Sequence, residues 1–299
     1  MTSPEESKII ISTLADTLKM EAKSNGTLSW AKYNLSQHYN TDKTEYIDLP
    51  DFPIKNKIKI VEGLDIKNNV FGTYKKIFAY LSPLIKDVNL AENRPFRILE
   101  VAGGVGDLSL GIYKESLRSA HNSSNTSSNS GEKLEVEITG SDIVAQYNEI
   151  ATEKARKKGY PVVFKSIDAL DIDKEVEASF DIVITLHSLH HFTPEQLIQL
   201  SRKSQKLAKQ GLFAVDGTRT VGNLLFMVIT ALMPSLFTFN SMYVHDALIS
   251  ARRMYSRKYL KKLLTLGCED SKVECEQLSL GLNYLRVSPK NGPDKTLTR

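Results

Sequence analysis

The chain has 299 residues and a formal net charge of +4, with 41% apolar and 25% charged residues. This length suits one large α/β domain with an appended segment, and the composition allows a full core. The balance of 39 basic and 35 acidic residues, without a basic run, argues against nucleic acid as a partner. Cys268 and Cys275 form neither a CxxC nor a zinc pattern, so we expect reduced thiols and no metal site. The acidic N-terminus lacks the basic region of a signal peptide, and a cytoplasmic location is expected.

Residues 1–94 are predicted to form a helical extension that caps the substrate. Apolar side chains recur at helical spacing in residues 8–22 and 71–88, and residues 28–39 suit a further helix. Pro83 predicts a kink or break inside the 71–88 helix. Residues 40–70 contain two prolines and many lysines, so loop and short turns are expected there.

Residues 95–288 predict a Rossmann-like, doubly wound α/β domain, because short apolar strands alternate with helices. The expected strands are 97–101, 134–140, 161–166, 180–186 and 211–216. The expected helices are 106–118, 145–159, 194–209 and, after the last of these strands, 256–266.

The end of the chain departs from this alternation. Segments 271–279 and 282–288, with Gly281 between them, predict an antiparallel hairpin at the edge of the sheet. The Asn- and Ser-rich segment 121–132 cannot bury apolar area, so a disordered loop is expected there. The tail 289–299 is expected to be disordered as well.

A glycine-rich segment, Glu100-Val-Ala-Gly-Gly-Val-Gly-Asp107, follows the first strand. Glycines let the backbone approach a ligand closely, and this position opens a crevice at the carboxyl end of the sheet. Ser109 stands where the dinucleotide fingerprint requires a third glycine, which disfavours NAD and a nicotinamide-dependent oxidoreductase. Glu100, at the strand end, suits a ligand that carries an ammonium group.

Two further carboxylates follow predicted strands. Asp142 can accept both ribose hydroxyls, and the insert at 121–132 explains its distance from the glycines, which exceeds the usual ~20 residues. The alternative is that Asp142 caps the helix at 145–159. Asp168 can accept an adenine amino group, and its alternative is a turn aspartate.

These segments, together with the strand and loop at 180–192 and the strand that ends at Asp216, resemble the class I S-adenosylmethionine (SAM) dependent methyltransferases. Ala102 and Gly106-Asp107-Leu108 are similar to the ubiquinone/menaquinone C-methyltransferase group, but the histidine loop 186–192 departs from that group. The resemblance implies SAM as cofactor and a seven-stranded sheet whose last strand is antiparallel. The predicted cofactor-binding residues are Glu100, Ala102, Gly103, Gly104, Gly106, Asp142, Ile143, Asp168, Ala169 and Leu186.

The histidine loop supplies the candidate catalytic residues, His187 and His190, with His191 beside them. Methyl transfer mainly requires positioning and exclusion of water, and a histidine can take the proton of an acidic acceptor. The alternative is that these side chains pack against the next helix, for which Thr193 is a suitable N-cap before Pro194.

The apolar insert 221–241 leaves three interpretations open: a core helix, a lid over a lipophilic acceptor, or a membrane-surface helix. A membrane span is rejected because it would separate the last strands from their sheet. We expect a small, lipophilic or aromatic acceptor, methylated at oxygen or carbon. The alternatives are a SAM-binding protein with a partner or scaffold role, and a protein methyltransferase.

Overall fold

The computed structural model describes residues 4–38, 40–124, 134–175, 180–238, 241–268, 270–279 and 281–290. The chain divides into two compact units. Unit 1 comprises residues 1–67, 187–202 and 214–287, and unit 2 comprises residues 68–186, 203–213 and 288–299. Each unit is therefore built from segments that lie far apart in the sequence.

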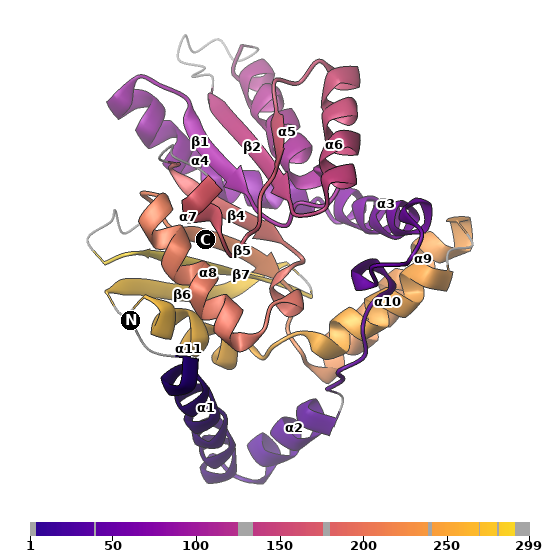
Figure 1. Cartoon of the computed structure of the whole chain (residues 1–299), viewed down its shortest axis with the longest axis vertical. Coiled ribbons are helices and arrows are strands. Elements are labelled where there is room, and N and C mark those ends of the chain that lie inside the picture. Colours follow the sequence, from indigo (N-terminus) through magenta and orange to yellow (C-terminus); the bar gives the residue numbers. More distant parts are fainter. Residues whose placement is uncertain are drawn as a thin grey trace. The chain divides into compact units, whose positions relative to one another are not determined.

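Helices and strands alternate through the middle of the chain (Figure 1). The helices are α1 (Pro4–Ser24), α2 (Thr27–His38), η1 (Tyr46–Asp48), α3 (Ile54–Val70), α4 (Thr73–Glu92), α5 (Asp107–Ser124), α6 (Ala145–Lys158), α7 (Ile172–Glu175), η2 (Leu189–His191), α8 (Pro194–Leu207), α9 (Val221–Thr238), α10 (Ser241–Arg253) and α11 (Arg257–Gly267). The strands are β1 (Phe96–Glu100), β2 (Val136–Asp142), β3 (Val163–Ser166), β4 (Ile182–Leu186), β5 (Leu212–Asp216), β6 (Ser271–Ser279) and β7 (Leu282–Pro289).

Seven strands form one sheet in the order β3-β2-β1-β4-β5-β7-β6. β1 pairs in parallel with β2 and β4, and β2 pairs in parallel with β3. The sheet is mixed, because its last strands are antiparallel. The predicted fold class, a Rossmann-like doubly wound sheet of seven strands with an N-terminal helical extension, is confirmed.

Unit 2 contains the parallel part of this sheet. The strands read as continuous apolar runs because both faces are covered; Ile98, Leu99, Ile182 and Ile184 are fully buried. α4 packs against α5, and α6 packs against β2 and β3 (Figure 1). Parallel pairing brings the carboxyl ends of β1, β2, β3 and β4 to one edge, and the predicted cofactor residues follow these ends.

Unit 1 contains α1, α2, α9, α10, α11 and β6. α1 packs against α2 and α11, and α9 lies alongside α10 (Figure 1). Ile60, Met227, Tyr243 and Met254 belong to one buried apolar cluster of this unit. Gly281 adopts a left-handed conformation between β6 and β7, as the predicted turn requires.

The loop expected at residues 40–70 is wrong for its second half, which forms α3. Pro50 and Pro53 precede the first helical residue, where a missing N–H is harmless. The Pro53 carbonyl accepts hydrogen bonds from the backbone N–H of Asn56 and Lys57. The prolines therefore lead into a helix rather than exclude one.

Of the kink or break expected at Pro83, the break is wrong, because α4 runs through this residue, and the kink stays a prediction. Proline cannot donate to the carbonyl four residues earlier, which belongs to Ala79. The Ser82 hydroxyl donates to that carbonyl at 2.9 Å. This side chain replaces the lost backbone hydrogen bond.

Two low-complexity predictions reach the edge of the described residues. Residues 121–124 close helix α5 instead of starting a loop, and residues 125–133 lie outside the described residues. Pro289 ends β7, and residues 291–299 of the predicted tail also lie outside them.

The apolar insert forms α9, which buries polar side chains and exposes apolar ones. Asn223, Met227 and Thr230 are buried, whereas Leu225, Ile229 and Leu232 are 61%, 54% and 47% exposed. The interpretation as a core helix therefore fails for the positions of Leu225, Ile229 and Leu232. Within the residues that the structure describes, no helix meets the length and apolarity that a membrane crossing requires.

Candidate functional site

The glycine loop of unit 2 leaves β1 in a tightly constrained path. Gly104 and Gly106 have φ of 53° and 79°, and Ala102 has φ of 50°, which is uncommon for a residue with a side chain. A Cβ atom on Gly106 would lie 2.5 Å from the Phe164 ring and 2.8 Å from Ala151. Only glycine fits there, so the loop lies directly on β3 and α6.

Glu100 is buried below this loop. Its carboxylate accepts hydrogen bonds from the backbone N–H and the hydroxyl of Ser109. Burial raises the pKa of Glu100 to about 8, although both Ser109 hydrogen bonds oppose the rise. A Cβ on Gly103 would lie 2.7 Å from the Glu100 carboxyl carbon. Glu100 therefore supports the loop and the start of α5.

Asp142 joins the end of β2 to the glycine loop. Its Oδ2 accepts from the Gly104 N–H at 2.8 Å, and its Oδ1 accepts from the Val144 N–H at 2.9 Å. Val144 is the N-cap of α6 and has no side-chain cap. Asp142 thus fixes both the loop and the approach to α6.

The other predicted cofactor residues lie along the same series of strand ends. Ile143 is 65% exposed, and Ala169 is buried. Asp168 accepts from the Leu170 N–H at 2.8 Å, which is the turn geometry of the alternative interpretation. Leu186 is the half-buried last residue of β4.

His187, the first residue of the histidine loop in unit 1, is buried and has φ of 57°. Burial, and next the positive charge of Lys67, lower the pKa of His187 to about 3. Lys67 is itself buried, where its Nζ lies 3.5 Å from Met227 Sδ, and burial lowers the pKa of Lys67 to about 8. His187 is therefore a neutral and weakly basic imidazole at pH 7.

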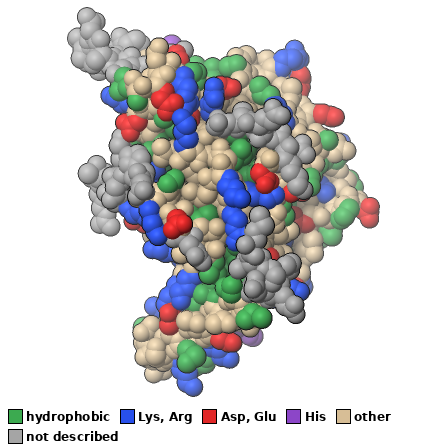
Figure 2. Space-filling view, turned by 60° about the vertical axis from the view of Figure 1, so that its left-hand side comes forward, with side chains coloured by type: hydrophobic (Ala, Val, Ile, Leu, Met, Phe, Trp, Pro, Cys, Tyr) green, Lys and Arg blue, Asp and Glu red, His purple; other side chains and the backbone are tan. Residues whose placement is uncertain are grey.

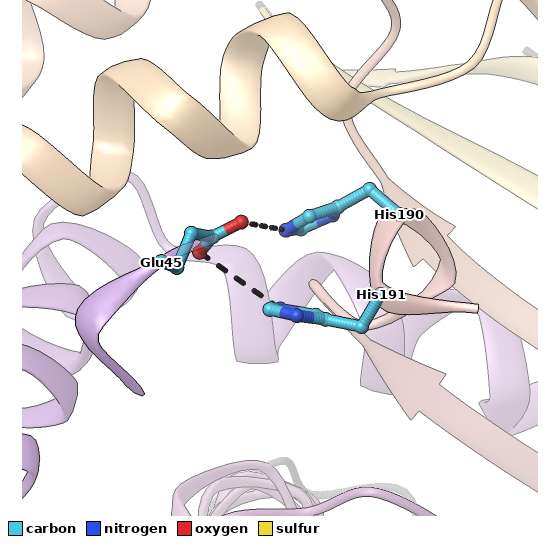
Figure 3. A group of neighbouring side chains, drawn as sticks. All are labelled: Glu45, His190 and His191. Carbon is cyan, nitrogen blue, oxygen red and sulfur yellow. Dashed lines mark ion pairs between the residues drawn. The ribbon is translucent and has the colours of Figure 1, made fainter. Parts of the chain in front are cut away.

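His190 and His191 lie together on η2 and face Glu45, as Figure 3 shows. His190 Nε2 lies 3.6 Å from Glu45 Oε1, and His191 Nε2 lies 4.0 Å from Glu45 Oε2. The other ring nitrogens meet carboxylates. His190 Nδ1 lies 2.9 Å from Asp216 Oδ2, and His191 Nδ1 lies 3.0 Å from Asp48 Oδ2.

Glu45 and Asp48 respond differently to this environment. Burial raises the pKa of Glu45 to about 7, against the effects of His191 and of the Ser250 hydroxyl, which donates at 2.6 Å. Burial also pushes the pKa of Asp48 upward, but His191 and Arg253 prevail and lower it to about 2. Arg253 contacts both acids, at 3.3 Å from Glu45 and 2.6 Å from Asp48.

A cavity of about 950 Å³ lies within unit 1 and is bordered by His190 and His191. The rest of its lining comes largely from α1, α2, the segment 40–42 and the segment 253–259. Its lining includes four aromatic side chains, from Tyr33, Phe192, Tyr255 and Tyr259. The lining also includes four basic side chains, from Lys32, Arg219, Arg253 and Lys258.

Charge on the surface is less concentrated than the basic charge in the cavity lining. On the face shown in Figure 2, basic and acidic side chains are interspersed.

In the cavity, Arg219 Nη1 donates to Asn40 at 2.6 Å, and the buried Nε of Arg219 has no hydrogen-bond partner among the described residues. The cavity is therefore a place where a ligand with an aromatic ring and an acceptor atom would find matching groups.

The structure separates the three sequence-predicted histidines. His190 and His191 border the cavity, and His187 is not among the residues that line it. The predicted N-cap at Thr193 is confirmed, because Thr193 and Gln196 exchange hydrogen bonds of 2.8 and 3.3 Å. That contact belongs to the helix, and it leaves the His190 and His191 rings facing Glu45.

Sequence reasoning missed Glu45 and Asp48 and gave Asp216 no role. Glu45 and Asp48 lie in the stretch expected to be loop, more than 140 residues before the histidines. A buried acid next to a short helix leaves no periodic signal. Asp216 ends β5, and that position at a strand end is the one signal that was available.

Comparisons with known proteins concern the fold and one segment of the sequence. A family model described as "Methyltransferase domain" matches residues 122–211. The plantazolicin methyltransferase BamL, in complex with a triazolic desmethylPZN analog and SAH, has a TM-score of 0.55 at 14% identity, covering 85% of this chain and 97% of that chain. The plantazolicin methyltransferase BpumL, in complex with SAH, has a TM-score of 0.53 at 14% identity, covering 93% and 100%. A search of curated protein sequences finds no match.

At these identities the solved structures establish the fold alone. The family match adds a similarity in sequence over the segment from the end of α5 to the turn before β5. The narrower resemblance to the ubiquinone/menaquinone group stays a prediction. In fold the chain is similar to these SAH-bound methyltransferases, and residues 122–211 are similar in sequence to the methyltransferase family model.

Proposed function

We propose that the protein is a SAM-dependent methyltransferase that acts on a small aromatic or lipophilic acceptor at oxygen or carbon. The observation that carries the proposal is the hydrogen bond between Asp142 and the Gly104 N–H. It closes a glycine loop against the neighbouring strand end, in a chain that has the methyltransferase fold.

In this proposal, Asp142 and the loop hold the cofactor. Asp142 accepts the ribose hydroxyls while it keeps the loop in place. Ile143, which is 65% exposed, offers an apolar surface to the adenine ring, and Asp168 accepts from the adenine amino group. Ala102, Gly103, Gly106, Ala169 and Leu186 complete the predicted pocket. Glu100 acts through Ser109 as a positioning residue, since its carboxylate is buried below the loop.

The reaction moves a methyl group from the sulfonium of SAM to the acceptor. The sulfur keeps the electron pair of the broken bond, which yields S-adenosylhomocysteine, and an acceptor hydroxyl loses its proton to a base. Of the two predicted catalytic residues, His190 suits this role better than His187. His190 borders the cavity and is oriented by Asp216, as a base is oriented by a third group.

The cavity of unit 1 supports an aromatic acceptor over a purely aliphatic one. Four aromatic side chains line it, and Arg219 and Lys32 can meet an acidic group on the acceptor. Its volume of about 950 Å³ falls within the range of small-molecule sites. Two of the structural neighbours are plantazolicin methyltransferases, and this similarity is compatible with an acceptor larger than a single ring.

The test is calorimetry with SAM, followed by SAH release over a panel of phenolic and carboxylic acceptors. Asp142→Ala removes two charged hydrogen bonds, so SAM affinity is expected to fall at least tenfold. Asp173→Ala is the matched control, because Asp173 pairs with Lys203 on α8. Wild-type protein that binds NAD but not SAM would overturn the proposal. Binding of SAM without SAH release on any acceptor would favour the scaffold role instead.

A further inference from the structure

The cluster of Glu45, His190 and His191 has a feature that general base catalysis does not need. Both imidazoles turn the same nitrogen, Nε2, toward one carboxylate (Figure 3). The three candidate ligand atoms lie within 4.8 Å of one another. A single base requires one such nitrogen, so the pairing of two calls for a different explanation.

The protons on the two rings are fixed by the carboxylates behind them. Asp216 and Asp48 lie 2.9 and 3.0 Å from Nδ1 of His190 and His191. A carboxylate accepts a hydrogen bond, so Nδ1 carries the proton and the lone pair of a neutral ring lies on Nε2. Histidines that bind metals almost always donate their other N–H to a carboxylate, a carbonyl or a water.

The charges at the cluster favour a cation. Glu45 and Asp216 are buried and Asp48 is close by, so three carboxylates surround two imidazoles. Arg253 contacts Glu45 and Asp48 and offsets part of this charge. Buried Lys67 interacts with Asp216 and offsets a further part. With Glu45 ionised, as a metal ligand must be, three carboxylates face two cations, and a bound cation would balance the remaining charge.

The ligand atoms lie further apart than a bound ion would hold them. Two ligand atoms about 2.1 Å from one ion lie roughly 3.0–3.4 Å apart. Two of the three separations are 3.6 and 4.0 Å, and all three are within 4.8 Å. Binding of an ion would therefore draw the three side chains together.

We propose that Glu45, His190 and His191 bind one divalent transition-metal ion of the Zn²⁺ or Co²⁺ type. Two imidazoles exclude Mg²⁺ and Ca²⁺, which prefer oxygen ligands. Three protein ligands leave open positions for a water or an acceptor oxygen, and His190 and His191 border the cavity. No such site was expected, because the sequence has no cysteine or histidine pattern with zinc spacing and Glu45 is remote from the histidines in the chain.

Binding of the ion does not depend on the proposed function, but the role of the ion in the reaction does. In a methyltransferase, such an ion would lower the pKa of an acceptor hydroxyl. His190 would then be a ligand and not the base. Binding of the ion and binding of SAM are therefore measured separately on the same protein samples.

The experiment titrates Co²⁺ into full-length protein that has been freed of metal with EDTA. One equivalent is expected to bind with visible absorption bands and to be displaced by Zn²⁺. Glu45→Gln and His191→Ala are expected to lower the affinity at least tenfold. Asp48→Asn, which keeps all three ligands, should lower it by about tenfold or more. His121→Ala is the control, since His121 is an exposed histidine near the end of α5 in unit 2.

The absence of a Co²⁺ band in the wild type, or equal binding in both ligand variants, overturns the metal site and leaves a network of ion pairs only. If His191→Ala does not fold, X-ray absorption of the Zn²⁺-loaded wild type decides by counting imidazole ligands, and fewer than two overturns the proposal. Lost Co²⁺ binding with intact SAM binding rejects this inference alone. The reverse result rejects the proposed cofactor role alone.

Discussion

The two units hold their buried acids in different ways. In unit 2, Glu100 is bound by Ser109, nine residues away, and Asp142 accepts from Val144, two residues away, and from Gly104, 38 residues away. In unit 1, Glu45 is bound by Ser250 and Arg253, 205 and 208 residues away. Local partners form as soon as the strand and its loop form. Distant partners exist only when the whole unit has folded, so the unit 1 cluster is the more sensitive to changes elsewhere in the chain.

The largest effect is expected at Gly106, in the glycine loop of unit 2. Gly106→Ala places a Cβ 2.5 Å from the Phe164 ring at a φ of 79°. Overpacking and left-handed strain together are expected to lower the free energy of unfolding by about 3 kcal/mol and to abolish SAM binding. Urea unfolding and calorimetry measure the two effects. Gly159→Ala is the control, because it has φ of 64° but no atom within 4 Å, and it should lose only about 1 kcal/mol. Equal losses would show that the loop is not held by packing.

Arg94 tests a buried acid of unit 2 whose partner is distant, since Arg94 and Asp181 are 87 residues apart. Arg94 makes two hydrogen bonds, of 2.6 and 2.7 Å, with the buried Asp181. In Arg94→Met, the Asp181 carboxylate keeps the hydrogen bond from the Arg97 N–H but loses the guanidinium. The expected loss of stability is about 2–3 kcal/mol. Arg118→Met removes an exposed pair with Glu115 and should change stability by less than about 0.5 kcal/mol. Equal thermal shifts in the two variants would contradict the importance of the Asp181 pair.

Glu100→Gln tests how the buried acid of unit 2 changes the stability of the protein with pH. The folded-state pKa of Glu100 is about 8, against an ordinary value of 4.5, because the site is buried. Between pH 4.5 and 8 the unfolded chain has released this proton and the folded chain keeps it, so the contribution of Glu100 to stability falls as pH rises. The variant is expected to match the wild type near pH 4.5 and to exceed it at pH 8, by on the order of 2 kcal/mol. Urea unfolding at both pH values measures this, and a constant difference would refute it.

The smallest effect is expected at Thr193, a local feature of unit 1. Thr193→Ala removes one of the two hydrogen bonds of its exchange with Gln196 and should lower the free energy of unfolding by about 1 kcal/mol. Cobalt binding should be unchanged, because the cluster partners are distant residues. A large loss of cobalt binding would show that the helix cap also positions the histidines.

Most of unit 2 could be predicted from the sequence, because its signals are local. Each strand is a short apolar run, and the predicted cofactor residues follow strand ends, so their convergence follows from parallel pairing alone. The prediction erred where a side chain changed the usual meaning of a residue. Ser82 replaces the hydrogen bond that Pro83 cannot donate, and Pro53 accepts hydrogen bonds that start α3.

Much less of the unit 1 site could be predicted. His190 and His191 were visible as a pair, but nothing in the sequence near Glu45 or Asp48 connects either acid with the histidines. Their meeting depends on Ser250 and Arg253 of α10 and on Asp216 at the end of β5, which are two other segments of the unit. The insert α9 was similarly ambiguous, because its polar residues Asn223 and Thr230 are buried while apolar ones are exposed.

Phe164 has a consequence for how this sequence can vary. One ring fills the space left by the missing side chains of both Gly106 and Gly140. An alanine at either glycine would collide with the ring. A smaller residue at 164 would make room for an alanine at Gly140, whereas Ala151 at 2.8 Å and the φ of 79° would still exclude one at Gly106. Positions 140 and 164 can therefore change together. In diverged relatives, a methyl group gained at Gly140 should be accompanied by a smaller side chain on β3.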